Sequence, residues 1–172
     1  MTMERTIHIL NRMREEGVFQ SYAIGGGIAA LFYIEPLTTF DLDVFVLLAN
    51  GPSPLVSLSP IYSWLQQRGY TPRGEQVVIE GIPVHFIPAY NPLVVEAVRA
   101  AVEKPYANAT ARVLAPEYLM AIMIQTGRPT DRERLMRFLE EAEISSELLE
   151  RILTEHGLKS ALESIRRSWH GG

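Results

Sequence analysis

The chain has 172 residues, which is the length of one domain or of one domain with a small appendage. Hydrophobic residues make up 47% and charged residues 21% of the chain, a balance that supports a buried core and excludes a disordered protein. Because 20 Asp and Glu outnumber 16 Lys and Arg, an overall basic surface for nucleic acid is excluded as well.

The first part of the chain is predicted to mix helices and strands. Apolar residues at helical spacing predict a helix over 3–16, and Gly17 ends it. A short strand at 18–24 leads into a glycine turn and a helix start at 28–33. Branched and aromatic residues make 40–47 the most strand-like run. The other elements expected here are a helix at 61–68 capped by Ser59, strands at 76–79 and 82–87 joined at Glu80 and Gly81, a helix from Pro92 to about Glu103 capped by Asn91, and a short strand at 111–114.

Beyond Pro116 the pattern becomes entirely helical. Helices are predicted at 117–126, 131–142, 146–156 and 158–168, with Thr130 and Glu133 forming a capping box at the second. Because the strands do not alternate regularly with helices, a mixed sheet fits better than a doubly wound parallel one. We therefore expect an α/β (α+β) fold: a core at 1–115 in which helices flank a mixed β-sheet, and a helical C-terminal region at 116–172 packed on it.

The cellular compartment is suggested by what the sequence lacks. It contains no cysteine, which excludes disulfide frameworks, thiol nucleophiles and cysteine-based zinc sites. Charged residues interrupt the first 20 positions, and no apolar run reaches the roughly 18 residues of a membrane span. We expect a cytoplasmic protein with no membrane association.

Asp41 and Asp43 form a candidate metal site. Aspartate occurs only three times in the chain, and two of the three lie two positions apart in the same predicted strand. Side chains at this spacing project from one face of a strand, and two neighbouring carboxylates repel unless a hard cation such as Mg²⁺ lies between them. The alternative is a pair of solvated carboxylates near a strand end.

Gly25, Gly26 and Gly27 form a candidate phosphate cradle. A glycine turn that leads into a helix offers free backbone N–H groups and the positive end of the helix dipole. Glycine also serves such turns for steric reasons alone. The order of the elements favours the phosphate interpretation, because the turn is followed within about 20 residues by a strand with two candidate metal ligands.

The sequence from Ala23 to Gly27, followed by Thr38 to Val44, resembles the minimal nucleotidyltransferases of the polymerase β superfamily. Their signature is an apolar residue, a Gly-Gly or Gly-Ser pair, a short helix and Asp-x-Asp. More narrowly, the chain is similar to the abortive-infection, type IV toxin–antitoxin nucleotidyltransferases, whose Arg-x-x-Asp-Arg motif is matched by Arg128, Asp131 and Arg132. The resemblance covers about residues 18–138 and implies a nucleotidyltransferase fold.

The resemblance also implies roles for individual residues. Asp41 and Asp43 would hold Mg²⁺ or Mn²⁺ while a hydroxyl attacks the α-phosphate of a nucleoside triphosphate. Asp131 would have a catalytic role, although it also fits an ordinary first helical turn. The residues expected to bind the nucleotide are Gly25, Gly26, Gly27, Thr39, Arg128 and Arg132.

His85 is where this chain departs most clearly from the family. It stands where active members often carry a third carboxylate, and it could serve as a general base or as a buried structural histidine. The region around Ile124 and Gln125 also lacks the lysine of the toxin group, and Leu37 replaces an arginine.

The leading hypothesis is metal-dependent transfer of a nucleoside monophosphate from a nucleoside triphosphate to an acceptor. The acceptor could be a tRNA end, a protein hydroxyl or a small molecule such as an aminoglycoside, and a toxin-like role would add an antitoxin partner. Two alternatives remain: a catalytically degenerate relative that binds a nucleotide or a partner, and an adaptor with no nucleotide site.

Overall fold

The computed structural model describes residues 3–26, 29, 33, 41–49 and 58–170. They form two compact units. The first contains the described residues up to Leu114 other than Tyr33, and the second contains Tyr33 and the residues from Ala115 onward. No helix among the described residues combines the length and the apolar character needed to cross a membrane.

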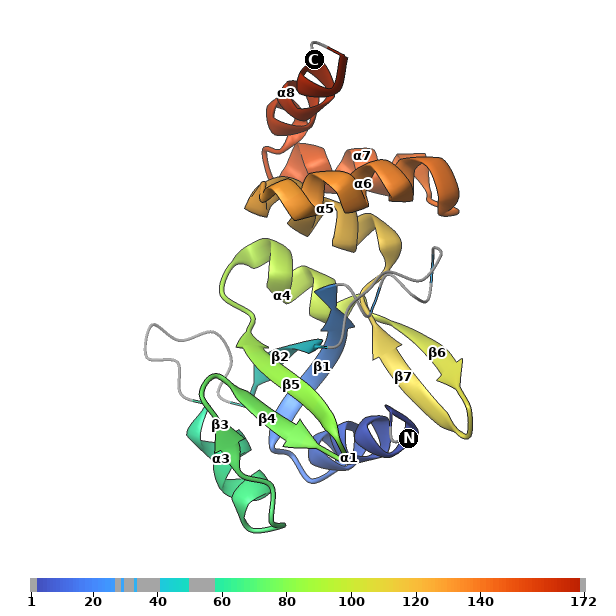
Figure 1. The fold of residues 1–172 in the computed structure, drawn as a ribbon. Coiled ribbons are helices and arrows are strands. Elements are labelled where there is room, and N and C mark those ends of the chain that lie inside the picture. Colours follow the sequence, from blue (N-terminus) through green and yellow to red (C-terminus); the bar gives the residue numbers. More distant parts are fainter. Residues whose placement is uncertain (1–2, 27–28, 30–32, 34–40, 50–57, 171–172) are drawn as a thin grey trace. The chain divides into compact units, whose positions relative to one another are not determined.

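A seven-stranded mixed sheet forms the framework of the first unit, with the strand order β3-β4-β5-β2-β1-β7-β6 (Figure 1). In its centre β2 runs antiparallel to β1 and parallel to β5, while β1 runs parallel to β7. The strands are β1 (Phe19–Gly25), β2 (Leu42–Leu48), β3 (Pro72–Arg73), β4 (Gln76–Ile79), β5 (Ile82–Pro88), β6 (Val102–Tyr106) and β7 (Ala109–Val113).

The central strands of this sheet are buried by helices. Four successive residues of β2, from Val44 to Leu47, are buried, which is typical of a strand covered on both faces. Helix α1 (Met3–Glu15) packs on β1 and β7, and α4 (Pro92–Arg99) packs on β1 and β2. The remaining described helix of this unit is α3 (Ser59–Gln66).

The second unit is helical and is built around α5 (Pro116–Thr126). Helices α6 (Pro129–Glu141), α7 (Ser146–Glu155) and α8 (Lys159–His170) all contact α5. Eight successive residues of α5, 117–124, are buried, as expected for a central helix. Gly127 ends the helix at a φ of 67°, a left-handed conformation that glycine adopts without steric cost.

The structure confirms the mixed sheet with flanking helices and the helical C-terminal half. It also confirms the tight turn at Glu80 and Gly81, whose φ angles of 52° and 85° match a two-residue hairpin. Asn91 caps α4 as predicted, because its side chain accepts a hydrogen bond from the backbone N–H of Val94. The helix start expected at 28–33 lies mostly outside the described residues.

Three local predictions were wrong. Helix α4 ends at Arg99 rather than near Glu103, because the following residues pair with β7 as strand β6. The cap of α3 is Leu58, so Ser59 is already inside the helix. Helix α6 begins at Pro129 with Arg128 as its cap, which leaves no capping box starting at Thr130.

Candidate functional site

Three predicted site residues lie side by side on the three central strands. Gly25 at the end of β1 is paired with Asp43 near the start of β2, and Asp43 is paired with His85 in β5. The antiparallel direction of β1 and β2 brings the end of one strand to the beginning of the next. The parallel pairing with β5 then places an imidazole beside the carboxylate.

The glycine turn lies directly against the Asp43 carboxylate. Gly26 has a φ of 64°, and a Cβ built on it would overlap Oδ2 of Asp43. A Cβ on Gly25 would overlap the ring of Phe45. Both positions therefore need glycine for steric reasons, and the same close packing brings the backbone of Gly26 next to the Asp43 carboxylate. A phosphate bound at this turn would be repelled by Asp43 unless a cation lay between them.

The Asp43 and His85 side chains are adjacent and partly open to solvent. The distance between Asp43 Oδ1 and His85 Nδ1 is 3.7 Å, and the side chains are 34% and 37% exposed. This distance exceeds that of a direct hydrogen bond, so neither group is locked to the other. Of the two roles considered for His85, that of a buried structural histidine does not match this exposure.

Asp41 is exposed and lies just outside the sheet. It directly precedes β2, whose first paired residue is Leu42. Only Asp43 of the pair is therefore inside the strand, whereas both were expected there. These three side chains, Asp41, Asp43 and His85, offer oxygen and nitrogen donors of the kinds that bind a divalent cation such as Mg²⁺ or Mn²⁺. In the described residues their ligand atoms do not all lie within 4.8 Å of one another, so a shared cation would require the side chains to draw together.

The Arg-x-x-Asp-Arg motif lies in the second unit, where Arg128 and Asp131 contact each other. Asp131 is buried, with a side chain 4% exposed, and its Oδ2 accepts a hydrogen bond of 2.9 Å from Nε of Arg128. Arg134 Nη1 approaches Oδ1 of the same carboxylate at 3.9 Å. Arg132 is exposed. Asp131 therefore organises an ion-pair cluster at the start of α6, in which Arg134 was not anticipated.

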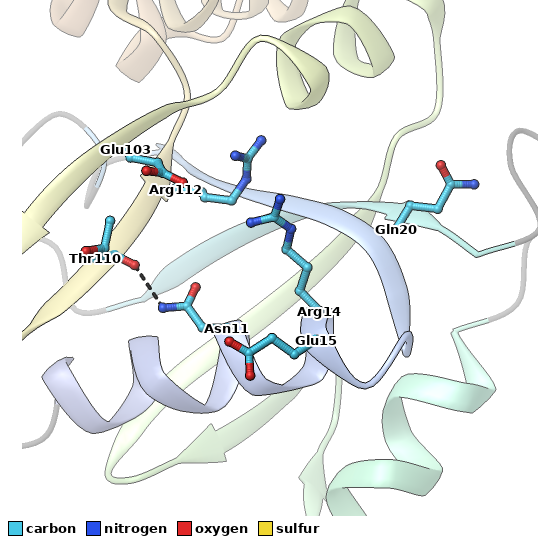
Figure 2. Close-up of a pocket in the computed structure, with 7 residues that line it drawn as sticks. All are labelled: Asn11, Arg14, Glu15, Gln20, Glu103, Thr110 and Arg112. Atoms are coloured by element: carbon cyan, nitrogen blue, oxygen red, sulfur yellow. Dashed lines mark hydrogen bonds between the residues drawn. The ribbon is translucent and has the colours of Figure 1, made fainter.

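Two predicted nucleotide-binding residues, Gly27 and Thr39, lie outside the described residues. The structure also contains a polar pocket that sequence reasoning missed. The pocket has a volume of about 470 Å³, and its arginines, Arg14 and Arg112, come from α1 and β7 (Figure 2). No short motif could have indicated it, because nearly 100 residues separate the two side chains in the sequence.

Comparisons with known proteins support the fold. No protein-family model and no curated protein matches the sequence. The crystal structure of an antigenic nucleotidyltransferase-like protein from Paracoccidioides brasiliensis is similar, with a TM-score of 0.54, 13% identity and coverage of 94% of this chain and 90% of that one. The crystal structure of ANT(2'')-Ia in complex with adenylyl-2''-tobramycin gives a TM-score of 0.50 at 13% identity, covering 99% and 98% of the two chains. The chain thus has the fold of nucleotidyltransferase-like proteins.

Proposed function

We propose that the protein transfers a nucleoside monophosphate from a nucleoside triphosphate to an acceptor hydroxyl. One observation carries this proposal: the backbone of a glycine turn at the end of β1 lies against the Asp43 carboxylate. In this arrangement a phosphate bound at the turn and a cation held by Asp43 would be neighbours in space. The nucleotidyltransferase-like fold gives the proposal its reaction class.

The substrate would bind through its phosphates. The N–H groups of the turn at Gly25, Gly26 and Gly27 would receive the β- and γ-phosphates. Asp41 and Asp43 would hold one or two divalent cations, Mg²⁺ or Mn²⁺. When bound, these cations neutralise the phosphate charge that would otherwise be repelled by the carboxylates.

In the reaction, the acceptor oxygen forms a bond to the α-phosphorus. The bond from the α-phosphorus to the oxygen bridging the β-phosphate breaks, and pyrophosphate leaves with that electron pair. The proton of the acceptor hydroxyl passes to the imidazole of His85. Because Nδ1 of His85 faces Asp43, its Nε2 is the nitrogen free to accept that proton.

For the acceptor, we propose a small molecule with several hydroxyl groups. The ANT(2'')-Ia structure contains an adenylylated aminoglycoside, and a chain with net charge -4 suits a cationic small molecule better than a nucleic acid. A tRNA end or a protein hydroxyl, with an antitoxin partner in a toxin-like role, would be the other outcomes of the test.

The test is transfer of label from each of four α-labelled nucleoside triphosphates, with Mg²⁺ or Mn²⁺. The acceptors are an aminoglycoside panel, total tRNA and a cell lysate. We expect transfer that is lost in Asp43→Asn and retained in Glu75→Gln, which removes an exposed carboxylate at the turn between β3 and β4. Absence of transfer under both metals to every acceptor would contradict the proposal.

A second candidate is a degenerate relative that binds nucleotide without catalysis. The presence of His85 beside Asp43, where active relatives often have a carboxylate, favours it. This candidate predicts that nucleotide with Mg²⁺ or Mn²⁺ raises the melting temperature although no label is transferred, because a ligand that binds the native state stabilises it. If nucleotide neither raises the melting temperature nor donates label, only the adaptor hypothesis remains.

A further inference from the structure

A polar pocket of about 470 Å³ lies in the first unit, at the beginning of β1 (Figure 2). This volume is in the range of small-molecule sites. Gln20, which lines the pocket, is five residues before Gly25 in the same strand, a separation of about 16 Å at ~3.3 Å per residue. The pocket is therefore distinct from the glycine turn and Asp43. Its lining residues are Asn11, Arg14, Glu15, Gln20, Glu103, Thr110 and Arg112.

One wall of the pocket is held in place by two hydrogen bonds of Asn11, one exposed and one partly buried. Asn11 on α1 donates from Nδ2 to the backbone carbonyl of Thr110 on β7, at 2.9 Å. Its Oδ1 accepts a hydrogen bond of 2.6 Å from the hydroxyl of Tyr22 on β1. Both polar ends of Asn11 are thus used to join α1 to two strands. The wall is formed before any ligand arrives.

Arg112 is anchored so that part of its guanidinium remains available. Its Nε donates to the carbonyl of Tyr22 at 3.1 Å and its Nη2 to the carbonyl of Val98 at 3.3 Å. An arginine has five N–H donors, so three remain for a ligand. The side chain is half-buried, which limits the cost in conformational entropy of binding through it.

Arg14 brings a second positive charge to the same place. Figure 2 shows its guanidinium and that of Arg112 projecting in the same direction from α1 and β7. Within the described residues, the Arg14 side chain has no hydrogen-bond or ion-pair partner. Burial and repulsion from Arg14 both lower the pKa of Arg112. The two cations are thus close enough to repel each other at the pocket.

Two carboxylates complete the pocket without forming an ion pair with either arginine, although the charge of Glu103 partly offsets the lowering of the Arg112 pKa. Glu103 is paired with Arg112 in the register of β6 and β7, and Glu15 follows Arg14 on α1. Among the described residues, neither carboxylate forms an ion pair with Arg14 or Arg112. The pocket therefore offers hydrogen-bond donors at the two guanidinium groups and acceptors at Glu15 and Glu103.

We propose that this pocket binds a small phosphate monoester, with the phosphoryl group bridging Arg14 and Arg112. A phosphoryl group carries close to two negative charges and three acceptor oxygens, so it can match two guanidinium groups, whereas a carboxylate neutralises only one. Hydroxyl groups on the rest of the ligand donate to Glu15 and Glu103. A sugar phosphate has both kinds of group.

The test is a titration of the full chain with inorganic phosphate and with ribose 5-phosphate, in the absence of divalent cations. Sodium chloride at the same ionic strength is the control. We expect saturable shifts of the arginine Nε–H resonances of Arg14 and Arg112 in ¹⁵N spectra, with ribose 5-phosphate binding more tightly. Because the reaction is not involved, failure here would leave the proposed transferase untouched.

Arg14→Gln is the informative variant, because the side chain is exposed and has no partner to lose. We expect it to weaken binding of both probes at least tenfold. Arg5→Gln is the matched control on the same helix, where the side chain is 75% exposed, and should leave binding unchanged. Shifts that sodium chloride reproduces, or equal affinity in Arg14→Gln and the unmodified chain, would overturn the proposal.

Discussion

Replacing Gly26 by alanine tests the close approach between the glycine turn and Asp43. At a φ of 64° an L-residue costs about 1–2 kcal/mol. The added Cβ would also overlap Asp43 Oδ2 and lie 3.1 Å from its Cγ. Moving the Asp43 side chain off its rotamer adds about 0.5–1.5 kcal/mol. We therefore expect Gly26→Ala to lower the free energy of unfolding by about 1.5–3.5 kcal/mol.

Gly74→Ala supplies a matched control in the same unit. Gly74 has the same φ of 64°, but nothing lies within 4 Å of a Cβ built there. Its substitution should cost only the backbone term, about 1–2 kcal/mol. The assay is urea unfolding of both variants, together with binding of a nucleoside triphosphate and Mn²⁺. Equal losses of stability, or unchanged nucleotide binding in Gly26→Ala, would refute the reasoning.

Three further predictions concern stability. Asp131→Asn should cost about 1–3 kcal/mol in urea unfolding, because a buried carboxylate that binds Arg128 is lost; unchanged stability would show that the cluster contributes nothing. Burial raises the pKa of Tyr22 from 10.0 to about 12, so the Tyr22 hydroxyl stays protonated to a higher pH in the native state than in the unfolded chain. The free energy of unfolding should therefore fall between about pH 10 and 12. In Tyr22→Phe this fall should be about 3 kcal/mol smaller, and parallel curves of unfolding free energy against pH for the two proteins would contradict the prediction. Asn91→Ala should cost about 1 kcal/mol in thermal melts, because its side chain caps α4, and an unchanged melting temperature would refute that assignment.

Local sequence signals predicted much of the fold. The β4–β5 hairpin followed from two strand-like runs around Glu80 and Gly81, and the cap of α4 followed from Asn91 and Pro92. Strand β6 was missed because Ala100 to Glu103 is compatible with a helix, and only its pairing with β7 makes it a strand. Such pairing is a tertiary effect that overrides local propensity.

The site was predictable as a set of residue types but not as an arrangement. The sequence pointed to the glycine turn, to Asp41 and Asp43 soon after it along the chain, and to His85, but not to the register that aligns Gly25, Asp43 and His85. Their order across the sheet depends on which strands pair, and β2 lies between β1 and β5 although 33 residues separate its last residue from the start of β5. Arg14 and Arg112 carried no local signal, because they meet only through the packing of α1 on β7.

The mixed directions of the central strands limit how this protein can change during evolution. Asp43 is aligned with Gly25 in one direction and with His85 in the other, so deleting one residue within β2 would displace it from both neighbours. Side chains alternate between the faces of a sheet, so the same deletion would also turn the carboxylate away from them. The tip of the β6–β7 hairpin, around Ala107, has no such double alignment. Length variation among homologues should therefore accumulate at that hairpin and be absent from β2.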